Sequence, residues 1–218
     1  VRKLSTCSPR YFSVTYGAGG STQERTFETV AWLREQGIET APHLSCVGAT
    51  RQTISEILDH YRQQGISRIV ALRGDMPSGM GEPGQLRSAT HLLTYRRQET
   101  GDYFHIEGAA DPETHPQAQN ALVDLDNFKT KVEAGANAAI TPYFYNPDAY
   151  FRFLDDCEKL GIDIPITPGI MPITNYRQLA RFSHMCGAEI PQWIRRRLEG
   201  FGDDMDALQA FGLDVVTR

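Results

Sequence analysis

Short apolar runs alternate along this chain with longer segments of helical composition. Runs rich in apolar and β-branched residues are typical of buried strands, so the pattern predicts strands at residues 11–17, 40–46, 68–74, 104–110, 138–145 and 164–170. A helix is predicted after each strand, at residues 21–36, 50–64, 85–98, 117–134, 147–160 and 174–185, with two further helices near 190–199 and 203–217. This strict alternation predicts a parallel sheet.

The ends of the predicted helices repeat a glycine signal. Gly37, Gly65 and Gly161 each follow a predicted helix and precede an isoleucine that leads into the next strand. Glycine adopts the left-handed backbone conformation easily, and it commonly ends helices for that reason. One helix start is marked as well, because Asn146-Pro147 fits an N-cap followed by proline at the first helical position.

A polar or glycine-rich loop follows every predicted strand, namely YGAGGST, HLSCVGAT, LRGDMPSG, DPETHPQ, YFYNPD and PGIMPITN. An open doubly wound sheet needs its ligand crevice only where the strand order reverses, whereas a closed barrel places functional loops after every strand. One site that draws on six strand ends favours the barrel. A complete barrel has eight strand–helix units and typically about 250 residues. The predicted fold class is therefore α/β, a TIM (β/α)8-type barrel that lacks its first and last strands, with residues 1–218 forming one catalytic-type barrel domain that is incomplete at both ends.

Composition and charge narrow the range of partners. The chain is 40% hydrophobic and 22% charged, as in ordinary globular proteins, and its net charge of -5 argues against nucleic acid or an anionic membrane as a partner. No apolar run is long enough to span a bilayer, and no apolar signal-peptide segment follows the basic N-terminus. The four cysteines form no CxxC pair, which disfavours a zinc site and a small disulfide scaffold. We expect a cytoplasmic protein with reduced thiols and no bound metal.

The tripeptide Arg73-Gly74-Asp75 directly follows the apolar run RIVAL at 68–72. The same three letters form an adhesion motif, which requires an exposed, extended loop. A buried strand that leads straight into them instead places them where parallel α/β proteins bind their ligands. Arg73 could hold a phosphate or pair with Asp75, and Gly74 would let a ligand approach the backbone closely. We therefore interpret the tripeptide as part of a ligand pocket.

Three other candidates each have a structural alternative. The loop 16–22 could hold a phosphate, but it lacks the lysine of a P-loop and the GxGxxG spacing, so a plain glycine-rich turn fits equally well. His43 lies near a predicted strand end, either as a core histidine or as part of a site. His115 lies in a loop rich in proline and acid, where it could contact a ligand, and no HxH or HExxH spacing supports metal binding.

Asp124, Asn127 and Lys131 lie in the predicted helix 117–134, spaced by three and four residues. Residues at this spacing share one face of a helix. A polar face of this kind is usually exposed to solvent. The other interpretation is a polar edge that faces a cofactor.

Several of these motifs occur in one fixed order: VTYGAGGST, APHLSC, IVALRGD, HP after the fourth predicted strand, DNFKTK, AGANAAIT and PGIMPITNY. In this combination the whole chain resembles the bacterial-type methylenetetrahydrofolate reductase family. The resemblance implies a flavoprotein TIM barrel that binds FAD at the carboxyl ends of its strands. It also implies an oxidoreductase of one-carbon metabolism and methionine biosynthesis, in which NAD(P)H reduces the flavin and the flavin reduces 5,10-methylenetetrahydrofolate to 5-methyltetrahydrofolate. The two substrates would use one site in turn, which gives ping-pong kinetics.

The resemblance also assigns roles to individual positions. The implied cofactor-binding residues are Thr15, Tyr16, Ala18, His43, Arg73, Gly74, Asp75, Ala89, His115, Asp124, Asn127 and Lys131. Asp75 would also be catalytic and would bind substrate, because a carboxylate beside the flavin and the folate favours the cationic iminium form of the substrate. Tyr176 would pack on the substrate or the nicotinamide. The implied partners are NAD(P)H and methylenetetrahydrofolate, and we expect a homo-oligomer.

Some positions depart from the family pattern. Ser88 and Asp111 stand where tyrosines are expected, Thr130 replaces a basic residue, and Pro142 replaces a glutamine that would hydrogen-bond substrate. The first-strand motif that carries the family's general-acid glutamate is not found within residues 1–218. These departures motivate an alternative function, a degenerate barrel that binds no flavin and serves as a non-catalytic interaction or assembly subunit.

Overall fold

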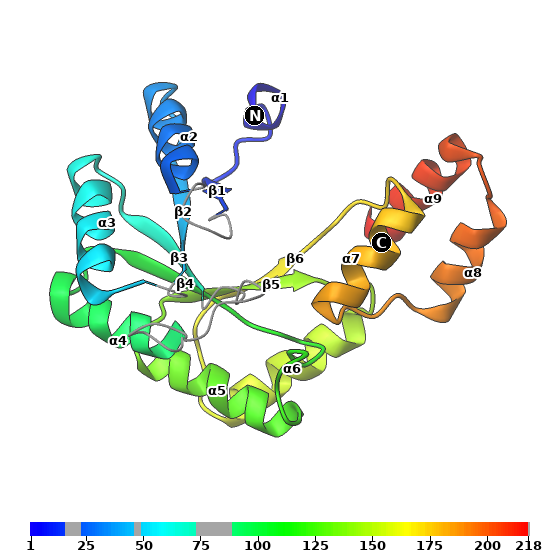
Figure 1. The fold of residues 1–218 in the computed structure, drawn as a ribbon. Coiled ribbons are helices and arrows are strands. Elements are labelled where there is room, and N and C mark those ends of the chain that lie inside the picture. Colours follow the sequence, from blue (N-terminus) through cyan, green and yellow to red (C-terminus); the bar gives the residue numbers. More distant parts are fainter. Residues whose placement is uncertain (16–22, 46–48, 73–88, 218) are drawn as a thin grey trace. The chain divides into compact units, whose positions relative to one another are not determined.

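Strands and helices alternate along the chain as the sequence pattern predicts (Figure 1). The computed structural model describes residues 1–15, 23–45, 49–72 and 89–217, apart from the side chains of residues 23, 89 and 96–99. The strands are β1 (Phe12–Val14), β2 (Thr40–Ser45), β3 (Arg68–Leu72), β4 (His105–Ala109), β5 (Ala138–Tyr143) and β6 (Ile166–Gly169). The helices are α1 (Arg2–Ser5), α2 (Gln23–Glu35), α3 (Arg51–Gln63), α4 (Ala89–Thr100), α5 (Ala121–Glu133), α6 (Pro147–Lys159), α7 (Tyr176–Cys186), α8 (Gln192–Gly200) and α9 (Met205–Thr217).

Within the described residues, six strands form one sheet in the order β1-β2-β3-β4-β5-β6. The pairs β1–β2, β2–β3, β3–β4 and β5–β6 are parallel. Each strand thus lies beside the strand that precedes it along the chain. This is the strand order of a (β/α) barrel, in which a helix returns the chain to the start of the next strand. The predicted α/β fold of the TIM-barrel type, with fewer strands than a full barrel, is confirmed.

The chain forms two compact units. Unit 1 comprises Val1–Ala109 and Thr130–Ala138, and unit 2 comprises Ala110–Lys129 and Ala139–Arg218. Each unit is therefore built from two separate stretches of the chain, and α5 contributes residues to both.

Asn137 joins the two stretches of unit 1. Its backbone N–H donates to the carbonyl of Ile106 at 2.9 Å, and its Oδ1 accepts from the Ile106 N–H at 2.8 Å. One residue of the second stretch thus satisfies both backbone polar groups of Ile106 in β4. Unpaired buried backbone groups are strongly unfavourable, so this contact completes the strand.

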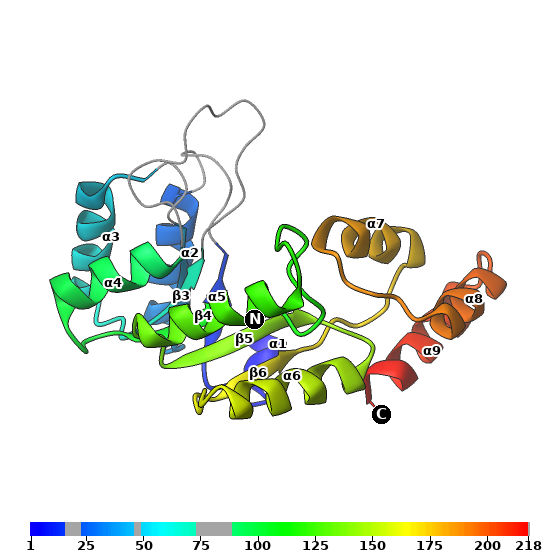
Figure 2. The same ribbon diagram turned by 90° about the horizontal axis from the view of Figure 1, so that it is seen from below.

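The apolar core of unit 1 lies between its strands and α2, α3 and α4, which Figures 1 and 2 show on one side of β1–β4. Ile69 and Ile106 are fully buried and adjacent in register on β3 and β4. Successive strand residues point to opposite faces. Val70 and Glu107, which are also paired in register, therefore lie on the other face of the same strands.

The predicted glycine signal ends three helices in the same way. Gly37, Gly65 and Gly161 have φ values of 71°, 70° and 72°. The isoleucine after each donates its N–H to a carbonyl in the last helical turn, at 3.0 Å for Ile38 and Ile66 and 2.9 Å for Ile162. This hydrogen-bond pattern is the Schellman motif, which leads the chain out of a helix.

Helix α5 begins at Ala121, four residues later than predicted. The side chain of Asn120 accepts from the Val123 N–H at 3.0 Å, and its carbonyl accepts from the Asp124 N–H at 3.1 Å. Asn120 therefore caps the helix, and residues 117–119 belong to the preceding turn. At α6 the predicted cap is confirmed, because the Asn146 side chain accepts from the Asp148 N–H and Pro147 is the first helical residue.

Pro142 disturbs the pairing of β5 with β6 in unit 2. The register shifts between Ile140 and Tyr143, on either side of the proline. Proline has no N–H to give to a strand ladder, and it is found in sheets at edges and irregularities. The Thr141 hydroxyl takes part instead, accepting from the Gly169 N–H at 2.9 Å and donating to the Pro142 carbonyl at 2.7 Å.

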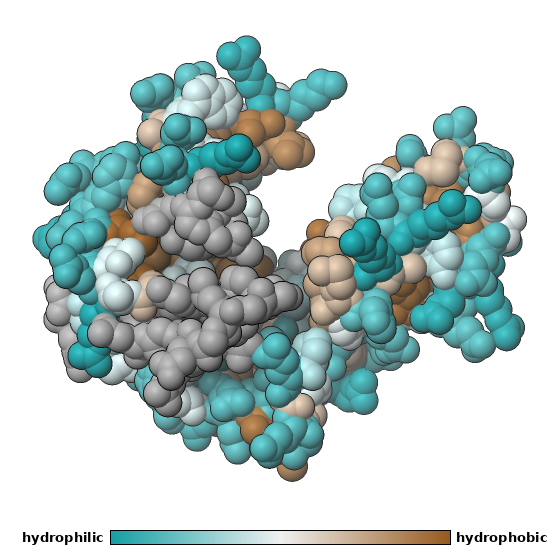
Figure 3. All heavy atoms as spheres, viewed as in Figure 1, coloured by the Kyte–Doolittle hydropathy of each residue, from teal (hydrophilic) through white to brown (hydrophobic). Residues whose placement is uncertain are grey.

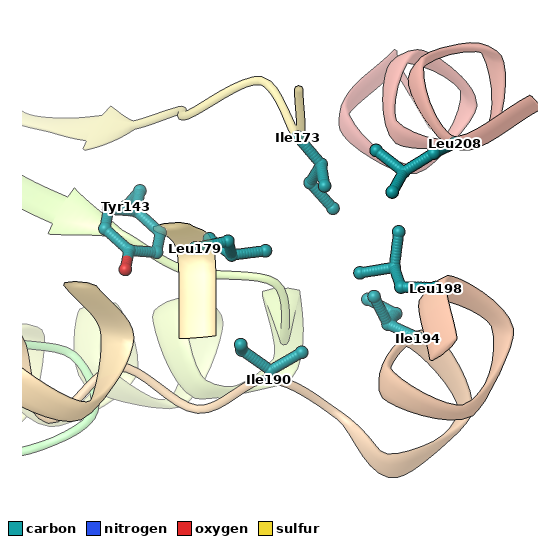
Figure 4. Packing of buried hydrophobic residues seen from close by; sticks show 7 residues of the cluster. All are labelled: Tyr143, Ile173, Leu179, Ile190, Ile194, Leu198 and Leu208. Carbon is teal, nitrogen blue, oxygen red and sulfur yellow. The ribbon is translucent and has the colours of Figure 1, made fainter. Parts of the chain in front are cut away.

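The core of unit 2 is a cluster contributed by β5, helices α7, α8 and α9, the segment after β6 and the segment between α7 and α8 (Figure 4). Its buried members are Tyr143, Ile173, Leu179, Ile190, Ile194, Leu198 and Leu208. Helix α9 approaches this cluster closely at Gly212, where an added Cβ would lie 2.8 Å from the Ile173 Cβ. Only glycine allows that approach without displacement of the neighbouring chain.

Outside the grey region, the face of the molecule in Figure 3 is mainly hydrophilic, with hydrophobic residues in several separate areas. In the part of the chain that the structure describes, no helix is both long enough and apolar enough to cross a membrane.

Candidate active site

Several of the predicted site residues lie outside the described residues, namely Tyr16, Ala18, Arg73, Gly74 and Asp75. Ala89 begins α4, but its side chain is likewise outside the description. The described positions fall into two groups. Thr15, His43 and Lys131 belong to unit 1, and His115, Asp124, Asn127 and Tyr176 belong to unit 2.

In unit 1 the structure brings Thr15 and His43 to neighbouring positions. Val14, the last residue of β1, pairs with Pro42 of β2; Thr15 directly follows β1, and His43 is the next residue of β2. Thr15 is exposed, and its carbonyl accepts from the Thr26 hydroxyl at 3.1 Å. His43 is half-buried, and burial lowers the pKa of its imidazole, while the negative charge of Glu107 opposes that shift. An imidazole with a lowered pKa, at a position of β2, and an exposed hydroxyl, directly after β1, therefore lie near each other.

Glu107, which the sequence analysis did not single out, is a buried carboxylate in β4 with 3% of its surface exposed. Tyr11 donates its hydroxyl proton to Oε2 of Glu107, and Arg68 donates from Nη1 to Oε1. The Arg68 guanidinium also lies over the Tyr11 ring, 4.9 Å from the ring centre. The available signal was a glutamate within the predicted strand 104–110, in which His105 is the other polar residue.

Lys131, in the last turn of α5, donates from Nζ to the carbonyl of Ala109 at 2.7 Å. Ala109 is the last residue of β4, so the ammonium group lies at the carboxyl end of that strand. A lysine in this position both stabilises the strand end and brings positive charge to it. Phosphate groups bind to such charges.

In unit 2 the structure brings His115 and Asp124 together. The His115 backbone N–H donates to Oδ2 of Asp124 at 2.7 Å, and the ring Nδ1 accepts from the Gln117 N–H at 3.1 Å. Because Nδ1 acts as an acceptor, the neutral ring carries its proton on Nε2. Asp124 thus orders the loop that carries His115. Asn127 lies one turn further along α5 and is exposed.

A pocket of about 400 Å³ in unit 2 is strongly acidic. Its walls include five carboxyl groups and one guanidinium group, from Asp111, Glu113, Asp124, Asp156, Glu189 and Arg152. Burial raises the pKa of Glu113, although its carboxylate accepts from the Glu189 N–H at 2.9 Å. The excess of negative charge makes this pocket unsuitable for a diphosphate.

Tyr176 is the first residue of α7, where Asn175 caps the helix by accepting from the Gln178 N–H. The Tyr176 hydroxyl donates to Oε1 of Glu199 at 2.9 Å. Both residues line a second pocket of unit 2, of about 390 Å³, together with residues of α8 and α9. The sequence analysis identified Tyr176 but not its partner Glu199.

Comparison with known proteins gives a match to the sequence model of one family, described as methylenetetrahydrofolate reductase, over residues 1–218. The chain belongs to the methylenetetrahydrofolate reductase family. The 5,10-methylenetetrahydrofolate reductase of Pectobacterium carotovorum is 40% identical over 217 residues, which are 99% of this chain and 72% of that protein. The enzyme of the same name from Escherichia coli K12 is 41% identical over 217 residues, with the same coverage of 99% and 72%.

A solved structure shares the fold of this reductase-family chain. It is an uncharacterized protein from Clostridium thermocellum that binds two copies of 5-methyl-5,6,7,8-tetrahydrofolic acid, with a TM-score of 0.55 and 13% identity over 99% of this chain and 85% of that chain. At that identity the likeness concerns the fold alone. The reductase family consists of oxidoreductases, and membership supports the reduction of a methylenetetrahydrofolate to methyltetrahydrofolate.

Two departures from the reductase pattern lie within the described residues of the strands and helices. Pro142 is exposed in β5, at the register shift, and it offers no amide group to a substrate. Thr130 is exposed in α5 and carries no positive charge. A further departure, Asp111, precedes α5 and lines the acidic pocket of unit 2.

Proposed function

We propose that this chain catalyses the reduction of 5,10-methylenetetrahydrofolate to 5-methyltetrahydrofolate by NAD(P)H, with FAD as its cofactor and one site used by both substrates in turn. The observation that carries the proposal is the family match over residues 1–218. The names of the bacterial relatives, at 40% and 41% identity, support the same substrate.

The polar groups of unit 1 fit a flavin. His43 offers a mainly neutral imidazole and Thr15 a hydroxyl, which suit the polar edge of the ring system, and Lys131 offers an ammonium group that suits a phosphate. The acidic pocket of unit 2 does not suit the diphosphate, so we propose that unit 1 residues hold the phosphates. When bound, FAD supplies the hydride chemistry, while the protein positions the substrate and sets the charge around it.

Two further residues would act on the folate. The Asp75 carboxylate would stabilise the cationic iminium form of the substrate, because a negative charge in a water-poor site favours a neighbouring positive one. The Tyr176 ring would pack against the substrate, with its hydroxyl oriented by Glu199. Both roles follow from positions that match the family motifs.

The first test is the visible absorption spectrum of the purified protein, before and after anaerobic addition of NADH. We expect the spectrum of a bound flavin, which bleaches when NADH is added. Protein that is colourless and takes up no added FAD would contradict the proposal. Turnover of methylenetetrahydrofolate by the reduced protein then tests the second half of the reaction.

Asp75→Asn separates the two halves of the reaction. The flavin should become easier to reduce, because a negative charge near it is lost, while folate reduction should slow by on the order of 100-fold. Stopped-flow absorbance measures both rates in the same sample. Asp59→Asn, at an exposed position on α3, is the matched control. Folate turnover that is unchanged in Asp75→Asn would rule out this role for the carboxylate.

The acidic pocket favours a second candidate, a barrel that binds no flavin and serves as a non-catalytic subunit. Asp111 forms part of that pocket at a position where the family pattern has tyrosine. The spectrum decides between the two candidates, because the second predicts a folded protein that stays colourless in the presence of FAD.

A further inference from the structure

Tyr11, Arg68 and Glu107 form a charged cluster in unit 1, centred on the buried Glu107 carboxylate, that the proposed reaction does not use. Glu107 is 3% exposed and accepts from both the Tyr11 hydroxyl and the Arg68 guanidinium. Burial and the contact with Glu107 raise the pKa of the Tyr11 phenol, so it stays protonated and acts as a donor. The carboxylate is thus held in place by one charged and one neutral donor.

The strand register connects this cluster to His43. His43 of β2 pairs with Val70 of β3, and Val70 pairs with Glu107 of β4. The three residues form one row across the sheet, and residues in one row point to the same face. Two strand spacings separate the outer members, which is roughly 10 Å. The side chains of His43 and Glu107 therefore share a face of the sheet, where His43 is half-buried and Glu107 is buried.

Among the described residues, further titratable groups on this face lie on β3 and β4 or directly before β1. Arg68 pairs with His105, so these two residues form the next row toward the start of the strands. Tyr11 immediately precedes β1. Within β1–β4 and the residue before β1, as far as the structure describes them, the face around His43 presents one carboxylate, one guanidinium, one phenol and a second imidazole.

We propose that the Tyr11–Arg68–Glu107 cluster holds a partly neutralised negative charge on the same face of the sheet as His43. The cluster thereby sets the electrostatic potential at a ligand beside His43. Glu107 is a positioning residue in this proposal, because it acts through His43 and touches no ligand itself. The proposal rests on the proposed function only for the identity of that ligand, a flavin. The arrangement of the row is independent of it.

Opposite variants test this coupling. In Glu107→Gln the carboxylate is lost, so a charged imidazole loses a stabilising partner and His43 should titrate at lower pH than in the unchanged protein. In Arg68→Met the carboxylate stays without its guanidinium, so His43 should titrate at higher pH. Charge interactions of this kind act over such distances when solvent screening is weak. Histidine labelled with 13C at Cε1 and followed by NMR across pH 4 to 9 measures both shifts, with the His43 signal assigned by its loss in His43→Gln.

The matched control is Glu39→Gln, which removes a carboxylate from an exposed ion pair of the same unit, with Arg34 at 2.7 Å. It should leave the His43 titration unchanged. A purely structural role for the cluster would shift His43 in the same sense in both cluster variants, or not at all, and either result overturns the proposal. Circular dichroism of each variant verifies the fold.

Milder variants serve if loss of a buried charge prevents folding. Arg68→Lys keeps the positive charge and should leave the titration near that of the unchanged protein. Tyr11→Phe removes a neutral hydrogen-bond donor, so it should shift the titration of His43 less than Glu107→Gln does. A larger effect of Tyr11→Phe than of Glu107→Gln would contradict an electrostatic mechanism.

The same variants distinguish failure of this proposal from failure of the proposed function. The NMR titration uses protein without added flavin, so its outcome stands whether or not FAD binds. If FAD binds, its midpoint potential should rise in Glu107→Gln and fall in Arg68→Met, because a negative charge nearby disfavours the reduced anion. If the His43 titration shifts in opposite directions in the two variants of a protein that never binds FAD, the coupling is supported and FAD is rejected as the cofactor.

Discussion

Glu107 and His43 illustrate what a single residue contributes to this molecule. Both are polar residues inside strands, and the Glu107 carboxylate is held by partners that lie far away in the sequence. Tyr11 and Arg68 are separated from Glu107 by 96 and 39 residues. The sequence pattern identified His43 as a candidate because it lies near a predicted strand end, but no local signal links a tyrosine and an arginine to a distant glutamate. Such partners become visible only when strand register is known.

The lowered pKa of His43 predicts how stability depends on pH. The folded pKa lies below the unfolded value near 6.5, so the unfolded state binds a proton more readily. The stability contributed by the neutral imidazole is complete above about pH 6.5 and is lost as pH falls through the folded pKa. Urea denaturation between pH 7.5 and 5 should therefore show a smaller loss of unfolding free energy in His43→Gln than in the unchanged protein.

The control for this measurement is His184→Gln, at an exposed position on α7. It should reproduce the pH dependence of the unchanged protein. If His43→Gln and His184→Gln lose the same unfolding free energy on acidification, His43 does not contribute to that dependence.

Individual helices and strands were predicted better than any other feature of this structure, because the sequence signals that specify them are local. The glycine–isoleucine pairs at Gly37, Gly65 and Gly161 directly follow the helices that they end, and all three glycines have the predicted left-handed conformation. Helix α5 begins later than predicted because the cap at Asn120 was not recognised, although asparagine is a common N-cap. Helix α1, at Arg2–Ser5, buries no residue and gave no apolar pattern to detect.

Helix α9 depends on the absence of a side chain at Gly212. In Gly212→Ala the new Cβ would overlap the Ile173 backbone, so either α9 or the segment after β6 must shift. We expect a loss of about 1–3 kcal/mol in the free energy of unfolding, as for other overpacked sites. Chemical denaturation followed by tryptophan fluorescence measures this loss.

Gly200→Ala is the matched control, at the end of α8 in the same unit, where an added Cβ meets no atom within 4 Å. It should be neutral or stabilise the protein by up to about 1 kcal/mol. Equal effects of the two substitutions would show that the close approach of α9 to Ile173 does not limit stability.

At the scale of the whole molecule, the sequence predicted the order of the elements and the barrel-type fold but not the two compact units. Alternating apolar runs report which residues form strands. They do not report that the chain leaves unit 1 after Ala109 and returns to it at Thr130. The site positions came from the fixed order of motifs rather than from periodicity. Their hydrogen-bond partners, such as Asp124 for the His115 backbone and Glu199 for Tyr176, could be identified only from the three-dimensional structure.

The return of the chain to unit 1 has a consequence for biosynthesis. A ribosome makes the protein from the N-terminus, so β4 is complete when Ala109 has been synthesised. The backbone groups of Ile106 that pair with Asn137 have no partner at that stage, because Asn137 is synthesised only after residues 110–129 of unit 2. Until that point a nascent chain carries an unfinished strand edge, the kind of surface on which newly made proteins associate wrongly and which chaperones bind.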